Sequence, residues 1–151
     1  GGCSRLLGGF QPLNLLLQAD FKVGTLPLSV FADYMKNTDA EVNPVAGSKL
    51  DTALAFGFTL NKASAPKSWE IGYVYQKTEK DAVFGQFVDS DFGGGVTDAE
   101  GSVIKAAWVP AANWTLNGTY FINTRFNDAP SGATTTDLDY KRLQLDLNFK
   151  F

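Results

Sequence analysis

The sequence predicts an all-β fold, an antiparallel up-and-down transmembrane β-barrel to which this chain contributes about seven strands. Apolar and polar residues alternate with a period of two through most of the chain, whereas helical periodicity is nearly absent. Connections between the alternating segments are short on one side and long and polar on the other, as in outer-membrane barrels. Tryptophans gather at the side with the short connections and on the apolar face, as at a lipid–water interface.

Seven segments carry this alternation, at residues 13–23, 28–37, 52–61, 69–78, 102–109, 114–125 and from about 138 to 151. In the first, every second residue from Leu13 to Val23 is apolar, with Asp20 and Lys22 among those between. The second to sixth each present large apolar residues, mostly Leu, Ile, Phe, Tyr and Trp, on one parity. The last ends in LQLDLNFKF, residues 143–151, which alternates without exception. Each segment therefore predicts a strand with one apolar and one polar face.

The connections sort by length. Short ones cover 24–27, 62–66 and 110–113 and carry Gly, Pro or Asn, which favour turns. Long ones cover 38–50, 80–101 and 127–137. The aromatic residues predicted to lie at the membrane interface are at the end with the short connections, and they are Trp69, Trp108, Trp114, Phe149 and Phe151.

The polar parity predicts the wall of a water-filled pore. Its charged and amide side chains cannot form a dry core without extensive pairing, but they can face water. Charged residues facing one another across the lumen would set a transverse field and tune ion preference. The predicted pore-lining residues are Asp20, Lys22, Asp33, Glu70, Gln76, Lys105, Asn117, Arg125, Arg142 and Asp146.

Composition narrows the function classes. The 151 residues suffice for one domain, and a net charge of −3 argues against nucleic-acid binding. There is no His, which removes the usual general base and metal ligand, and Cys3 is the only cysteine, a small loop residue. No run of about 18 apolar residues predicts a membrane helix, whereas a barrel strand crosses in about ten alternating residues.

Seven strands are an odd number, and closed bacterial barrels of this kind have an even number. If the last strand descends to the side with the short connections, the first descends too, so residues 1–12 form a loop or irregular segment on the long-loop side. We therefore expect residues 13–151 to be the C-terminal strands of a larger barrel. In the alternative, an irregular eighth strand around residues 5–10 closes a small packed barrel.

Three stretches carry a family resemblance: LPLSVFADYMKNTDA, WEIGYVYQKTEKDAVFGQFVDSDFGGGVTDAEG and NWTLNGTYFINTRF, together with the final Phe151. They resemble the bacterial "putative porin" family of Gram-negative outer membranes, from about Leu13 to Phe151. The resemblance implies a larger barrel whose C-terminal portion is this chain. The terminal aromatic residue is also similar to the signal that the barrel-assembly machinery reads.

Two loop stretches and a set of carboxylates also invite a functional interpretation. Asp89, Asp91, Gly94 and Glu100 match part of an EF-hand calcium spacing, but Gly93 occupies a ligand position and no helices flank it, which favours an acidic glycine-rich loop. The nearby apolar stretch 83–87 is expected to fold inward as a constriction or over the pore mouth. Carboxylates facing the lumen, such as Asp33, Glu70 and Asp146, could do acid–base work, but water-lining charges are favoured without a His partner.

The sequence thus predicts a non-enzymatic porin of the bacterial outer membrane that lets small hydrophilic solutes diffuse passively, with no cofactor and no metal. Its expected partners are outer-membrane lipid, the barrel-assembly machinery and the solutes, and homo-oligomers are left open. The alternative is a structural or interaction barrel whose long external loops bind a surface partner.

Overall fold

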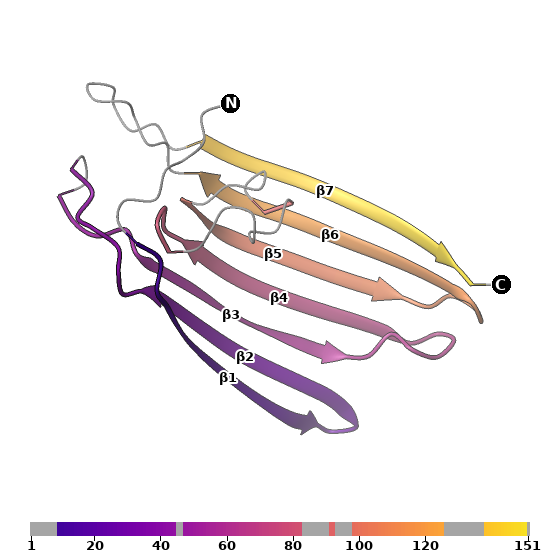
Figure 1. Cartoon of the computed structure of the whole chain (residues 1–151). Helices are drawn as coiled ribbons and strands as arrows, with labels where there is room; N and C mark the ends of the chain where they lie inside the picture. Colours follow the sequence, from indigo (N-terminus) through magenta and orange to yellow (C-terminus); the bar gives the residue numbers. More distant parts are fainter. Residues whose placement is uncertain (1–8, 45–46, 83–90, 93–97, 126–137, 151) are drawn as a thin grey trace.

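The structure, a computed structural model, describes residues 9–44, 47–82, 91–92, 98–125 and 138–150. A single sheet of seven strands lies side by side in sequence order (Figure 1). The strands are β1 (Pro12–Val23), β2 (Leu26–Asn37), β3 (Thr52–Asn61), β4 (Trp69–Thr78), β5 (Ala99–Trp108), β6 (Trp114–Arg125) and β7 (Leu138–Phe149). Each strand pairs antiparallel with the next along the chain, and β1 and β7 form the two edges of the sheet. The predicted all-β, up-and-down arrangement is confirmed.

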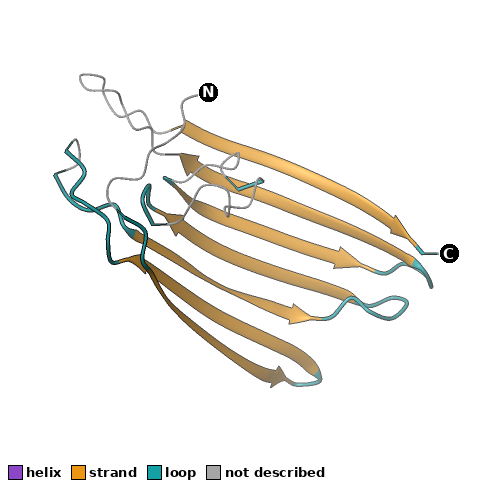
Figure 2. Cartoon of the chain, in the orientation of Figure 1, coloured by secondary structure: helices purple, strands orange, loops and turns teal. Residues whose placement is uncertain are grey.

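Within the described ranges the strands are joined by loops and turns, and no helix occurs (Figure 2). The same part of the chain contains no helix long and apolar enough to cross a membrane.

The starts of β2 and β5 differ most from those predicted. β2 begins at Leu26 because Gly24, with φ of 63°, lets the chain reverse over residues 24–25 alone. β5 begins at Ala99 rather than at residue 102, since Gly101 is paired with Gln76 and Asn123 instead of ending a loop. Gly101 has φ of 152°, and a Cβ there would lie 2.6 Å from Asn123 Cα. Glycine therefore continues the strand where the sequence pattern predicts the end of a long loop.

The register places the apolar parity of every strand on the same face of the sheet. Leu15 is opposite Tyr34, and Tyr34 is opposite Leu54, so the apolar parity of each strand continues onto the next. We call this side the apolar face and the opposite side, which carries the other parity, the polar face. Aromatic pairs bridge strands on the apolar face, with ring centroids 5.2 Å apart for Phe56 and Tyr75 and 4.7 Å apart for Trp114 and Phe149.

The small buried core lies on the polar face, near the long-loop end. Phe92, from the connection between β4 and β5, packs with Ala99 and Val103 of β5 and Phe121 of β6. Val74 and Tyr140 flank this cluster. Most large apolar side chains are elsewhere, on the exposed apolar face. A water-soluble sheet packs its apolar face against a core. This sheet instead leaves most of its large apolar side chains exposed.

Candidate functional site

Rows of opposed residues cross the polar face from strand to strand. The central row contains a polar residue at each edge and apolar or small residues between them, and it reads Gln18, Phe31, Gly57, Val74, Val103, Phe121 and Arg142. The next row toward the short turns is almost wholly polar and contains Asp20, Ser29, Thr59, Gly72, Lys105, Thr119 and Gln144. On the polar face, a central row of mostly apolar or small residues thus lies next to a row of mostly polar residues.

The residues predicted to line a pore are spread over several adjacent rows of this face. Asp20 and Lys105 belong to the polar row, and Arg142 ends the central row. A row nearer the short turns joins Glu70, Ala107, Asn117 and Asp146. Lys22 is opposite Pro27 at the end of β1, Asp33 is opposite Ala55 and Gln76 is also opposite Ala55. The backbone of Arg125 ends β6, but its side chain lies outside the described residues.

Several of these polar side chains are held by their neighbours. Ser29 Oγ donates to Asp20 Oδ1, and Asn14 Nδ2 donates to Asp33 Oδ1 at 2.6 Å. Gln144 Nε2 donates to Asp146 Oδ2 at 3.2 Å. Such bonds fix the direction of the carboxylates without removing their charge. The polar face can therefore present charges at fixed positions to whatever lies above it.

A loop segment covers part of the central row. Phe92 is only 1% exposed and lies against Val103 and Phe121, while the preceding Asp91 pairs with Arg142 at 2.5 Å between Oδ1 and Nη1. The segment 91–92 is therefore anchored on the polar face by one buried ring and one ion pair. The apolar stretch 83–87, which was predicted to fold inward, lies outside the described residues.

Sequence reasoning missed this anchoring row. Val74, Val103 and Phe121 break the alternation, because each is an apolar residue at a polar-face position. Their common departure on three successive strands was a readable signal that something apolar covers this face. The sequence could not identify Phe92 as the covering residue, since no periodicity extends into a loop.

A second set of contacts connects segments of the chain at the long-loop end of the sheet. The Asn37 side chain is fully buried and links three segments: its Oδ1 accepts from Gln11 N at 2.9 Å, and its Nδ2 donates to Asp81 O at 3.0 Å and to Gly9 O at 3.1 Å. Nearby, Asp98 ends the connection into β5. Burial, opposed by Lys80 but reinforced by Glu79 and Asp81, raises the pKa of Asp98 to about 6.

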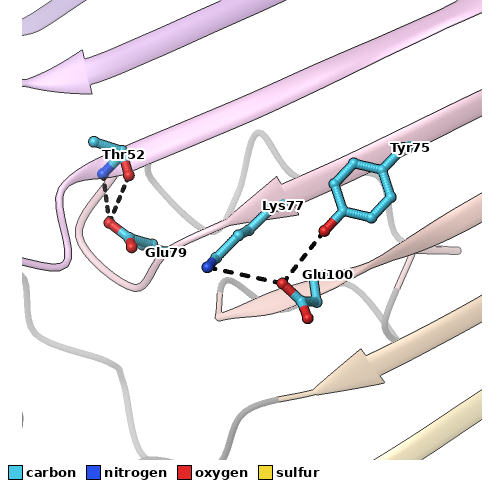
Figure 3. A network of polar contacts seen from close by, with 5 residues as sticks. All are labelled: Thr52, Tyr75, Lys77, Glu79 and Glu100. Carbon is cyan, nitrogen blue, oxygen red and sulfur yellow. Dashed lines mark hydrogen bonds and ion pairs between the residues drawn. The ribbon is translucent and has the colours of Figure 1, made fainter.

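The apolar face also ends in polar residues toward the long loops. A row of opposed residues there contains Lys77, Glu100, Thr124 and Asp139. Glu100 Oε2 forms an ion pair with Lys77 Nζ at 3.8 Å and accepts a hydrogen bond from Tyr75 Oη at 3.5 Å. Glu79 Oε2 accepts hydrogen bonds from N and Oγ1 of Thr52 (Figure 3). The apolar part of this face, which we call the apolar band, thus ends in charged residues on the long-loop side.

At the other end, the band is bounded by aromatic rings. Trp69 is opposite Trp108, and Trp114 is opposite Phe149, all on the apolar face at the short-turn ends of their strands. All four side chains are exposed. Phe151, the fifth residue predicted for this belt, lies outside the described residues.

No group of three His, Cys, Asp or Glu side chains that could hold a metal ion is found in the described part of the chain. Of the partial calcium pattern, Asp91 is bonded to Arg142, whereas Asp89, Gly93 and Gly94 lie outside the described residues, as does Cys3.

Comparison with known proteins gives one match. The family model described as "putative porin" matches residues 4–151 of this chain. No curated protein and no solved structure matches.

Proposed function

Because the chain belongs to the "putative porin" family, we propose that it forms part of an outer-membrane channel through which small hydrophilic solutes diffuse passively. In this proposal the apolar face contacts lipid and the polar face lines a water-filled lumen. Passage needs no catalytic group, so solutes are selected by lumen width and by the fixed charges along the polar face.

The inverted exposure of the two faces is the observation that supports this proposal most. Along β3, the apolar-face residues Leu54, Phe56 and Phe58 are exposed, whereas their polar-face neighbours Ala53, Ala55 and Thr59 are partly covered. In water so large an apolar surface would favour association. In a bilayer it is the expected exterior, because lipid solvates apolar side chains.

The size of the apolar band is consistent with a membrane. On β6 its apolar-face residues run from Trp114 to Ile122, a stretch of nine residues, and a tilted transmembrane strand crosses a bilayer in about 9–11 residues. Outer-membrane barrels carry such an apolar band between aromatic girdles. The rings at Trp69 and Trp108 at one end and the ion pair of Lys77 with Glu100 at the other agree with interfacial boundaries.

The anchored segment 91–92 suggests where the lumen is narrowest. A loop that is docked on the central row reduces the free cross-section and places the Asp91–Arg142 pair beside the solute path. Width would then be set by Phe92, and ion preference by the charges around it.

Planar-bilayer conductance of the full-length protein tests both the channel and the constriction at Phe92. Discrete conductance steps are expected, and Phe92→Ala should enlarge them, because loss of a packed ring costs about 3–5 kcal/mol and would release the segment. Phe92→Leu, which keeps an apolar anchor, is the matched control.

Absence of conductance steps would overturn the channel, and a stoichiometric co-purified partner in that case would favour the interaction barrel. Conductance steps of equal size in wild type and Phe92→Ala would be consistent with the channel but would contradict a constriction at Phe92.

A further inference from the structure

An open apolar groove of about 400 Å³ crosses the apolar face near the short-turn ends of β4 to β7. Its lining includes Trp69, Ile71, Ala106, Trp108, Gly118 and Leu145. A methylene group is close in size to a water molecule, whose share of liquid volume is about 30 Å³, so the groove has room for about a dozen methylenes.

The groove exists because two small residues are neighbours on a face that otherwise carries large ones. One row joins Ile71, Ala106, Gly118 and Leu145 across four strands. Ala106 and Gly118, at the centre of this row, leave a hollow between the two larger residues. The opposed pair of Trp69 and Trp108 borders it on the side of the short turns.

Positive charge lies just beyond the tryptophans. Lys67 N donates to Val109 O at 2.6 Å and Val109 N donates to Ser68 O at 3.0 Å, so the ladder between β4 and β5 continues past the tryptophan pair. Lys67 is thereby held next to the end of the groove, with its side chain exposed. The short turns 24–25, 62–68 and 109–113 contain two lysines, Lys62 and Lys67, and no acidic residue.

One carboxylate approaches the groove from the other face. Glu70 is among the lining residues, but it has polar-face parity, and its Oε2 accepts from Ala63 N at 3.4 Å under the turn. Its charge is therefore directed toward the turn backbone, whereas Lys67 lies just beyond the tryptophan pair that borders the groove.

We propose that the groove holds one acyl chain of an anionic glycerophospholipid, whose phosphate is bound by Lys67 with Lys62 as a second cation. The observations fit this occupant in two ways: the groove is apolar and chain-sized, and the only charges in the turns are cationic. An unfilled hollow would forfeit dispersion contacts, which a flexible chain restores. The inference rests on the proposed function in one respect, that the apolar face lies in lipid.

Photo-crosslinking in phospholipid nanodiscs tests the site. The probes are phosphatidylglycerol and phosphatidylcholine, each with a diazirine in one acyl chain, and labelled peptides are mapped by mass spectrometry. Phosphatidylglycerol should label the groove strands more strongly than the surface around Ala32, and more strongly than phosphatidylcholine does. Lys67→Gln should lower this labelling about fivefold, the effect of one lysine near an anionic surface.

Matched variants separate the groove from the surface in general. Ala106→Leu fills the hollow, so groove labelling should fall to the level around Ala32. Ala32→Leu and Lys36→Gln, on the same face but away from the groove, should change nothing. Lys67→Gln lies in a turn and tests the site even if Ala106→Leu does not fold.

Equal labelling by both probes, or equal labelling along the whole apolar face, would overturn the inference while leaving conductance intact. Crosslinks between two copies of the chain at these residues would also overturn it, in favour of a protein contact. A chain that does not enter nanodiscs at all would overturn the proposed function together with the lipid site.

Discussion

At the scale of single residues, the acidic side chains near the long loops differ in how their charge is compensated. Glu79 accepts two hydrogen bonds from Thr52, and Asp91 is paired with Arg142. Asp98 is instead half-buried in a left-handed backbone conformation with φ of 67°. Burial raises its pKa to about 6, and Glu79 and Asp81 add to that rise against Lys80 and Lys77. The charged form of Asp98 is therefore the costly one.

This shift has a definite sign. The folded pKa is above the ordinary value of 3.8, so the folded protein binds this proton more tightly than the unfolded chain does. The favourable contribution is complete below about pH 4 and is lost as the pH rises through 6. Asp98→Asn should therefore be neutral at pH 4 and stabilising at pH 8, by about 1 kcal/mol after discounting for solvent screening.

Urea unfolding in lipid vesicles at the two pH values, followed by tryptophan fluorescence, measures this difference. Asparagine tolerates a positive φ, so the backbone is not expected to change. Glu41→Gln, at an exposed carboxylate in the β2–β3 connection, is the control for removal of one acidic side chain. An equal offset for Asp98→Asn at both pH values would contradict the assignment.

At the scale of strands, close backbone approach decides which glycines can be replaced. A Cβ on Gly57 of β3 would lie 2.2 Å from Tyr73 O of β4, whereas a Cβ on Gly72 of β4 would lie 3.5 Å from its nearest neighbour, Phe58 O. Both glycines have polar-face parity and both are paired within the sheet. They form a matched pair that differs mainly in available space.

Gly57→Ala should accordingly destabilise the protein by about 1–3 kcal/mol, the usual cost of overpacking, because β3 and β4 must move apart. Gly72→Ala should be close to neutral. The urea midpoint of unfolding in lipid vesicles measures both. Equal midpoints for the two variants would show that the β3–β4 separation at Gly57 is not as the structure has it.

Most strand positions were predictable, and the exceptions have local causes. β3, β4 and β6 have the predicted bounds because turn residues flank segments that alternate over most of their length. β5 begins three residues before its predicted start at residue 102, since Gly101 resembles a loop residue in the sequence. Whether a glycine turns the chain or lets two strands approach depends on its neighbours in space, here Ile122 and Asn123.

At the scale of the whole molecule, the central expectation is that the apolar face lies in lipid. Leu145 of β7 is 68% exposed on that face, and its neighbour Gln144 belongs to the polar face. Leu145→Arg should cost about 2–4 kcal/mol in a bilayer, as charges on the lipid side of a barrel do. Gln144→Arg should cost much less, because that side chain would face water.

Urea unfolding in lipid vesicles measures the free energy of unfolding of both variants and compares them directly. In a water-soluble sheet an exposed leucine could become arginine at little cost, so a neutral Leu145→Arg would argue against the membrane placement. A large cost for both variants would instead argue that the polar face is not solvated.

Alternation alone assigned residues to faces, because successive side chains on a strand point to opposite sides. Hence the up-and-down sheet, the apolar and polar faces and the aromatic residues at the short-turn end could all be predicted. The role of the polar-face residues in lining a pore remains a prediction.

Tertiary structure decided which residues meet across strands and which loop residue covers them. The register brought Val74, Val103 and Phe121 into one row, Phe92 covered that row, and Ala106 met Gly118 to open a groove. These contacts join residues far apart in the chain, and no local pattern encodes such distances. Register depends on the summed fit of whole strands, and loop docking depends on a surface that exists only once the strands are paired.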